Sequence, residues 1–482
     1  MPVPPVQPAP ARPKKEPTGL LGWTILFLCC VAMIGQRLLE DQGPVPGPSK
    51  RASAVGASAN PGDSPSVQLQ LVGRCLVGLK LMGGAAPAPK SSAANAAIGN
   101  LSDAAKTNLD KLRAAMVEGE LSGPDAARKE LDDLEADKDL ADDLKTDAGI
   151  VRKLLEGDSA AASSATPEER KRLTDRHRWF AKVALTRGLP SSDPLRAEVE
   201  SSARNSMTVL GVFAFTAISG MLVGFALMVV AIIRLAIGSA KRRFNPRPDM
   251  PRRHRVALLE GAAMMLSGFL IIPYIAGFVQ NVTGLNLGWA MIWLVLPLGL
   301  WPLARGMSFA ELRSAIGWHT GAGWNTPVNV LREIGCGIAG FVAGLPIVLV
   351  GLLITATLVV VTKASPSHPA VEKTGDLKSA WDGARLLLLA CVWAPVVEET
   401  LFRGLLYTYL RGWLGCFLSS LIVAFIFAAI HPQGWSFVPV LMSVAVVLAF
   451  LREWRGSIIA SMTGHCMLNL TEMGMLILAM SM

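Results

Sequence analysis

The sequence has few charged residues for its length. Of its 482 residues, 17% are Asp, Glu, Lys or Arg, whereas 51% are hydrophobic. A soluble chain of this length would form about three domains, and this composition is too apolar for three soluble domains. The charge content therefore excludes an ordinary soluble protein.

The sequence also has few cysteines, and their spacing does not match a known disulfide or metal-binding pattern. No C-x-x-C pair occurs, so neither a disulfide framework nor a cysteine metal site is expected. Six of the seven lie in or against apolar segments, where a thiol behaves as a small hydrophobe, and Cys75 stands apart. The seven are Cys29, Cys30, Cys75, Cys336, Cys391, Cys416 and Cys466.

Long apolar runs are abundant instead. A helix of about 20 apolar residues crosses the roughly 30 Å hydrocarbon core of a bilayer. The fold class predicted is an all-α polytopic membrane protein with about nine transmembrane helices. They are expected near residues 19–35, 207–238, 256–279, 286–303, 334–362, 383–410, 416–431, 436–451 and 457–479.

The basic residues indicate topology rather than nucleic-acid binding. The net charge is +9, but the basic clusters lie beside apolar stretches, with seven lysines and arginines between 241 and 255. Such loops are typically cytoplasmic. Alternation from this loop puts every other basic loop on the same side and the N-terminus in the cytoplasm. We expect a multi-pass cell-membrane protein whose first helix is an uncleaved anchor, with no nucleic-acid partner.

The chain divides into four predicted domains. Residues 1–40 form a tail and signal-anchor helix, 41–204 an extracytoplasmic linker and helical domain, 205–365 transmembrane helices two to five, and 366–482 the last four helices. Residues 42–68 and 84–96 have linker composition. Between 101 and 189 apolar residues recur at helical spacing. Thr166, Pro167 and Glu169 predict the capped start of one helix.

Six polar side chains interrupt the last four apolar helices. A charged residue in such a helix costs at least about 2.5 kcal/mol, so it is a functional candidate by default. One buried histidine alone is usually structural, but so many polar groups in three of four consecutive helices favour a site. The six are Glu398, Glu399, Arg403, His431, His465 and Asn469.

Helix geometry separates the two glutamates. Glu399 and Arg403 are four residues apart in the orientation that favours an ion pair. Glu398 points about 100° away and is the better general base, because a desolvated carboxylate becomes more basic. Counting residues from the turn near Gly415 puts Glu399 and His431 at equal depth. His465 and Asn469 share one face of the final helix.

Two further expectations concern residues around this cluster. Pro395 lacks an N–H, so the carbonyl of Cys391 is expected to lose its helix partner. Four other histidines lie in predicted loops or soluble segments and are expected to contact water. They are His177, His254, His319 and His368.

The ordered set Glu-Glu-x-x-x-Arg, Phe-x-x-x-His and His-x-x-x-Asn, on successive membrane helices, resembles the CPBP (Abi/CAAX-protease-like) family of intramembrane proteases, which includes the type II CAAX prenyl endopeptidases. The resemblance covers about residues 382–475. It implies that Glu398 and His431 activate a water. It also implies that His465 and Asn469 stabilise the oxyanion, and that Glu399 and Arg403 shape the site.

The resemblance implies a membrane-embedded endopeptidase that acts on a membrane-associated protein or peptide within the lipid bilayer. Family members are often called metalloproteases. No His-Glu-x-x-His motif occurs, and the candidate zinc ligands are Glu398, His431 and His465. Two alternatives remain open: a non-catalytic immunity or scaffold protein of the same fold, and a proton-coupled carrier, although no internal repeat supports a carrier.

Overall fold

A computed structural model describes most of the chain as helices. The described residues are 19–40, 67–82, 99, 101–102, 104–105, 107–138, 140–156, 164–238, 250–285, 287–320, 327–362 and 379–481. No strand occurs in any of these ranges, which confirms the all-α prediction. The predicted linkers, the lysines of the N-terminal tail, His368 and most of the basic loop at 241–255 lie outside them.

The chain forms two compact units. The first contains residues 1–47, 228–362 and 395–464, and the second contains 48–227, 363–394 and 465–482. The last four predicted membrane helices therefore contribute residues to both units. The boundaries of the four predicted domains stay a prediction.

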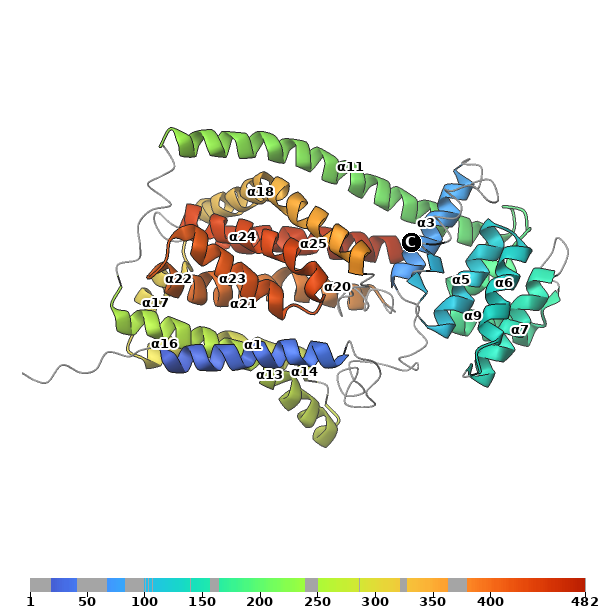
Figure 1. The fold of residues 1–482 in the computed structure, drawn as a ribbon, viewed down its shortest axis with the longest axis horizontal. Coiled ribbons are helices and arrows are strands. Elements are labelled where there is room, and N and C mark those ends of the chain that lie inside the picture. Colours follow the sequence, from blue (N-terminus) through green and yellow to red (C-terminus); the bar gives the residue numbers. More distant parts are fainter. Residues whose placement is uncertain are drawn as a thin grey trace, which may run out of the picture. The chain divides into compact units, whose positions relative to one another are not determined.

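The first unit is a bundle of apolar helices. Helix α24 (Val438–Arg455) packs against both α18 (Pro327–Thr362) and α23 (Cys416–Ile430), and α1 (Leu20–Glu40) packs along α13 (Arg252–Thr283) (Figure 1). The indole of Trp23 on α1 donates to the Tyr409 hydroxyl at 3.1 Å, which joins α1 to α22 (Tyr407–Arg411). These contacts build the frame that holds the candidate site.

Glycines on α18 allow its close approach to neighbouring helices. A Cβ added at Gly344 would lie 2.4 Å from Val447 Cγ1 of α24, and one at Gly337 would lie 2.6 Å from the Ala460 carbonyl of α25 (Ile459–Ser481). Both distances are far below van der Waals contact. Small residues at such positions let membrane helices pack backbone to backbone.

Four described helices are long and apolar enough to span a membrane: Pro194–Ala236, Arg252–Thr283, Pro327–Thr362 and Trp435–Arg455. Three apolar helical runs are shorter, at Leu20–Gln36, Gly288–Leu298 and Cys416–Ile430. The chain is therefore a membrane protein with several apolar helices, and the count of nine spans stays a prediction.

The apolar helix expected near 286–303 is present but broken into short pieces. This segment forms α14 (Gly288–Met291), a 3-10 turn η1 (Ile292–Leu294), α15 (Val295–Leu298) and α16 (Trp301–Ala304). Pro297 and Pro302 remove two backbone donors, so the helix stops at Gly299 and starts again. The short pieces pack against α13.

The second unit contains the predicted helical domain. It is formed by α5 (Asn108–Leu121), α6 (Pro124–Glu135), α7 (Asp142–Glu156), α9 (Pro167–His177) and α10 (Trp179–Leu185) around one apolar core. The leucines that recur at helical spacing, such as Leu112, Leu131 and Leu154, are fully buried there. Thr166 and Glu169 form the predicted capping box.

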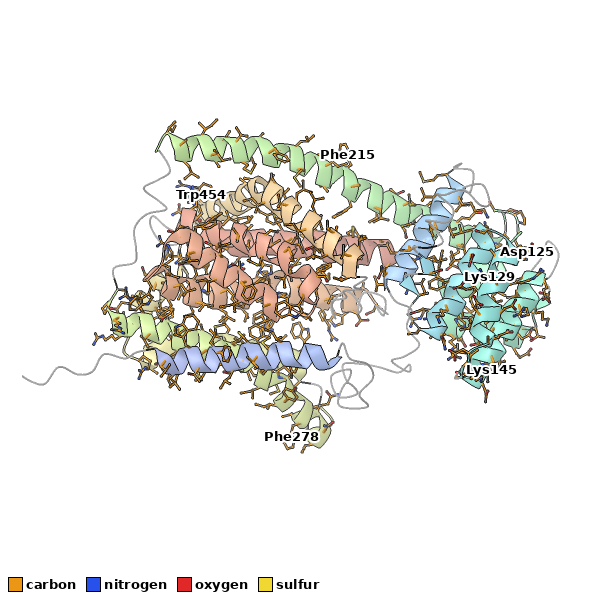
Figure 2. The ribbon with its side chains drawn as sticks, viewed as in Figure 1. Asp125, Lys129, Lys145, Phe215, Phe278 and Trp454 are labelled. Carbon is orange, nitrogen blue, oxygen red and sulfur yellow. The ribbon has the colours of Figure 1, made fainter. Side chains whose placement is uncertain are left out.

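The surface of this unit changes character along the chain. Asp125, Lys129 and Lys145 are charged and exposed on the helical domain, whereas Phe215 projects from α11 (Pro194–Ala236) with 73% of its surface exposed (Figure 2). An exposed apolar helix fits lipid, and a charged surface fits water. We therefore expect the membrane boundary along α11 to lie between its start and Phe215.

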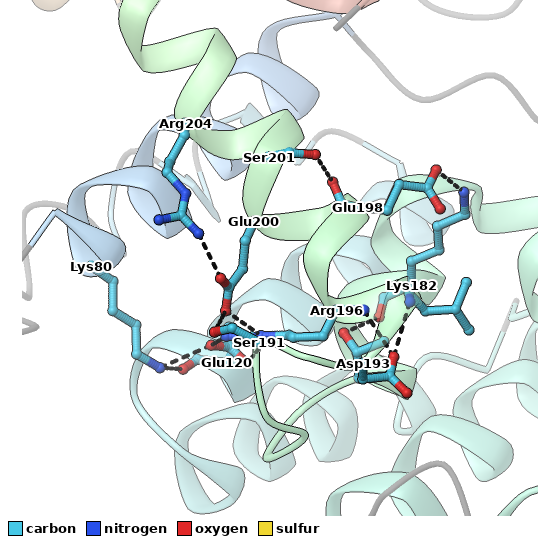
Figure 3. Close-up of polar contacts among 12 residues, drawn as sticks. Lys80, Glu120, Lys182, Ser191, Asp193, Arg196, Glu198, Glu200, Ser201 and Arg204 are labelled. Atoms are coloured by element: carbon cyan, nitrogen blue, oxygen red, sulfur yellow. Dashed lines mark hydrogen bonds and ion pairs between the residues drawn. The ribbon is translucent and has the colours of Figure 1, made fainter.

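A buried ionic network ties α11 to the helical domain (Figure 3). The Arg196 guanidinium donates to both carboxylate oxygens of Glu120 at 3.0 and 3.1 Å and to Glu200 at 3.0 Å. Lys80 of α3 (Val67–Leu81) adds an ion pair to Glu120 at 3.0 Å. Because the charges are paired, their burial is tolerated.

Two of the histidines expected to contact water are buried. His177 is 0% exposed and its Nε2 lies 3.3 Å from Asp147 Oδ2 on α7, while His254 is 5% exposed. The prediction failed for His177 because a partner on another helix, Asp147, satisfies it.

Candidate active site

The two adjacent glutamates lie in a helix that departs twice from regular α geometry. It runs through α20 (Ala380–Leu388), a π-helical turn η2 (Leu389–Trp393), α21 (Ala394–Glu399), a second π-helical turn η3 (Thr400–Leu406) and α22. In a π turn each N–H bonds to the carbonyl five residues earlier, and such turns are frequent at functional sites.

Glu399 forms the ion pair that the sequence predicts. Its Oε1 accepts from Arg403 Nη1 at 2.8 Å, and both side chains are fully buried. The same guanidinium donates from Nη2 to the Ala445 carbonyl of α24 at 3.2 Å and covers the Phe427 ring of α23 at 4.8 Å. Arg403 thus joins three helices, and Glu399 neutralises its buried charge.

Glu398 faces a different partner. Its Oε2 lies 4.0 Å from His431 Nε2, and the two side chains are 16% and 17% exposed. This contrasts with the fully buried Glu399 and Arg403 beside them. This approach of His431 to Glu398 agrees with the equal depth that residue counts predict for the two helices.

The backbone fixes the orientation and tautomer of His431. This residue ends α23 in an extended conformation, and its Nδ1 lies 2.6 Å from the Phe427 carbonyl. A carbonyl only accepts, so Nδ1 carries the proton that it donates. In the neutral ring Nε2 then has a lone pair, and it is this atom that lies 4.0 Å from Glu398 Oε2. A tilted contact with the Phe427 ring, at 4.1 Å between ring centres and 45° between planes, also holds the imidazole.

His465 and Asn469 belong to the second unit, one turn apart on α25. His465 is 5% exposed, and Asn469 donates from Nδ2 to the Ala390 carbonyl at 2.7 Å. An amide nitrogen has two N–H groups, so one bond orients Asn469 while the second N–H remains. Convergence of this pair with Glu398 and His431 stays a prediction.

The Ala390 carbonyl is available because of Pro395, but not as the sequence predicted. The expected orphan was the Cys391 carbonyl, four residues before the proline. In the π turn Ala394 donates to Leu389 instead. This shift moves the unpaired carbonyl back by one residue, from Cys391 to Ala390. Pro395 is five residues after Ala390 and has no N–H to donate to it. Asn469 takes the carbonyl so released.

The described residues do not complete a zinc site by themselves. A catalytic zinc takes three protein ligands, and no group of three His, Cys, Asp or Glu side chains occurs among the residues that the structure describes. Glu398 and His431 supply two donors in the first unit. His465 as the third ligand stays a prediction, and no catalytic step is derived through a metal.

Glu472 is a polar residue of α25 that the motif analysis missed. It follows Asn469 by three residues and His465 by seven, and it is exposed. It interacts electrostatically with His465. The signal was available in the sequence, because a spacing of seven residues puts two side chains on one helix face.

Comparison with known proteins supports a protease-like domain in this part of the chain. Residues 380–471 match the family model described as type II CAAX prenyl endopeptidase Rce1-like. This match supports the CPBP/CAAX-protease-like resemblance that the motifs of the segment predicted. An uncharacterized 24.3 kDa protein of Escherichia coli is 27% identical over 162 residues, which cover 32% of this chain and 70% of that protein. No solved structure matches significantly.

Proposed function

We propose that the chain is an intramembrane endopeptidase in which Glu398 and His431 activate a water for attack on a peptide bond. The observation that carries this proposal is the pairing of two proton acceptors. His431 Nε2, which carries the lone pair when Nδ1 donates to Phe427, lies 4.0 Å from Glu398 Oε2. That separation exceeds a hydrogen bond but suits one water donating to both, because its two donor directions hold acceptors about 4 Å apart.

The reaction follows from this arrangement. The water oxygen attacks the carbonyl carbon while Glu398 takes a water proton, and the carbonyl becomes an oxyanion. His465 and the second N–H of Asn469 would stabilise that oxyanion, as the family resemblance implies. When the C–N bond breaks, Glu398 returns the proton to the leaving nitrogen, which yields an amine and a carboxylic acid.

The paired charges beside the site serve a different purpose. Glu399 is fully buried and bound to Arg403, so it is less available than Glu398 as a base. Arg403 in turn covers Phe427, whose carbonyl orients His431. We assign Glu399 and Arg403 the role of positioning residues.

Glu398→Gln tests the proposal. The variant keeps the shape but removes the basic oxygen, so cleavage per folded molecule should fall about 10²- to 10⁴-fold. The assay incubates purified full-length protein with a complex peptide library and identifies new termini by mass spectrometry. Glu260→Gln is the matched control, because Glu260 is a membrane-helix carboxylate bound to Arg305 at 2.8 Å and to Trp301.

Two outcomes would contradict the proposal. Cleavage by Glu398→Gln at the wild-type rate would remove Glu398 from catalysis. If no peptide is cleaved, while the biological function of the wild type survives in Glu398→Gln, the chain would be a scaffold of the same fold.

Zinc bound by Glu398, His431 and His465 remains a separate proposal, which metal analysis of the purified wild type and His431→Ala tests.

A further inference from the structure

The face of α25 that carries His465 and Asn469 continues to a third polar residue, Glu472. At 100° per residue, Glu472 lies within about 20° of His465 and about 60° of Asn469 around the helix. Leu470 and Leu478, which are 50% and 49% exposed, lie about 140° from His465 on either side. The apolar exposed side is therefore the opposite side of the helix, and Glu472 does not share it.

Packing along this face is interrupted at Glu472. On one side of it His465 is 5% exposed, and on the other Leu476 and Ala479 are 9% and 0% exposed, yet Glu472 itself is exposed. Met473 and Leu476 pack against Val67 of α3. Glu472 is thus an exposed residue between buried ones on this face.

The end of α25 is held firmly beyond this position. Arg74 of α3 donates to the Ala479 carbonyl at 2.8 Å, and Ser206 of α11 donates to the same carbonyl at 2.9 Å. Asn469 is held on the near side by Ala390. Glu472 therefore lies on a stretch of helix held on both sides, so the position of its backbone relative to Asn469 is well defined.

In the membrane helix predicted at 457–479, a carboxylate is costly unless it is paired or functional. No salt bridge to Glu472 occurs within the described ranges. The family match ends at residue 471, so Glu472 is also not a position that this match covers. Its accessibility on the polar face suggests that the missing cation comes from a bound molecule.

We propose that Glu472 is a specificity residue that binds a lysine or arginine side chain of the peptide substrate. This inference rests on the proposed endopeptidase function. Glu472 is three residues beyond Asn469, or about 4.5 Å along the helix axis. An extended peptide advances about 3.3 Å per residue. The basic residue should therefore lie within about three positions of the scissile bond.

The test compares substrates that differ in one charge. The probe is a cleaved peptide from the library above, resynthesised with lysine, norleucine or glutamate at each of the three positions on either side of the cut. The wild type should prefer lysine at one position. Glu472→Gln should raise KM for that peptide by about 10- to 100-fold, the range for one charged hydrogen bond, with kcat little changed. The norleucine peptide should be cleaved equally by both proteins.

Two further variants complete the design. Glu472→Asp keeps the charge and should retain the preference for lysine, whereas Glu472→Lys should shift the preference towards glutamate. An equal loss of kcat on every peptide in Glu472→Gln would overturn the proposal, and so would an unchanged lysine preference. If the wild type cleaves no peptide at all, the endopeptidase function itself is refuted. Failure of that function is therefore distinguishable from failure of the role proposed for Glu472.

Discussion

Arg403 shows how single buried residues organise the site. It binds Glu399, the Ala445 carbonyl and the Phe427 ring from three different directions. A fully buried arginine persists only while its charge is compensated. The site therefore depends on Glu399 for its architecture, as the four-residue spacing to Arg403 predicts.

Glu399→Gln should lower the amount of folded protein. The variant leaves the guanidinium of Arg403 buried without its counter-charge, which costs about 3–5 kcal/mol. Fluorescence-detected size exclusion after heating measures the folded fraction, and Glu398→Gln serves as the comparison. A normal folded fraction for Glu399→Gln with lost turnover would exchange the roles of the two glutamates.

His177 should make the helical domain sensitive to mild acid. Burial lowers the pKa of His177 despite its bond to Asp147, so the native state binds fewer protons than the unfolded state below its usual value of about 6.5. Stability is then complete above that value and falls as pH decreases below it. Asp147, whose pKa is also lowered, contributes only near and below its own usual value of about 3.9.

His177→Gln should remove most of this pH dependence, because glutamine keeps a donor for Asp147 but does not titrate. Hydrogen exchange in Pro167–His177, corrected for the intrinsic rate, measures it between pH 7.5 and 5. Equal pH dependence in both proteins would show that another group is responsible.

Among the elements, α18 depends on glycines more than on side-chain packing. Gly344→Ala should destabilise the protein by about 1–3 kcal/mol, because the added methyl group meets three carbons of the branched Val447 side chain at 2.4–3.1 Å. The matched control is Gly335→Ala on the same helix, where no atom lies within 4 Å. There the better helix propensity of alanine should be neutral or gain up to about 1 kcal/mol.

Thermal unfolding of both variants in the same detergent checks this expectation. Equal midpoints for Gly344→Ala and Gly335→Ala would show that α18 and α24 separate enough to accept the methyl group. The comparison isolates contact between helices, since both changes have the same effect on the isolated helix.

The candidate site shows how far sequence reasoning extends. The Glu399–Arg403 pair follows from the four-residue spacing, and the approach of His431 to Glu398 follows from equal depth. The π turns do not follow, because a one-residue shift of hydrogen bonds leaves no pattern in composition. The bond from Asn469 to Ala390 depends on that shift and was missed with it. His177 was placed wrongly because its partner lies on a different helix.

For the whole molecule, the basic loops predict which side of the membrane each surface faces. Extracellular maleimide should label a cysteine at Lys129, on the helical domain, and should not label one at Ala310, in the predicted inner loop; both positions are exposed. Cys75→Ser removes the background thiol outside the apolar segments. Labelling of Ala310→Cys in intact cells, with Lys129→Cys protected, would invert the topology.

The widened turn at Thr400–Leu406 makes the length of this helix as important as its composition. It separates the two glutamates from Tyr407 and Arg411, which both bind Glu453 on α24. Inserting one residue there would rotate one group relative to the other by about 100°, so either the acids or the Glu453 contacts would be lost, whereas removing one residue would return the π turn to an ordinary α turn. During evolution, this segment should accept exchanges of apolar residues but reject insertions.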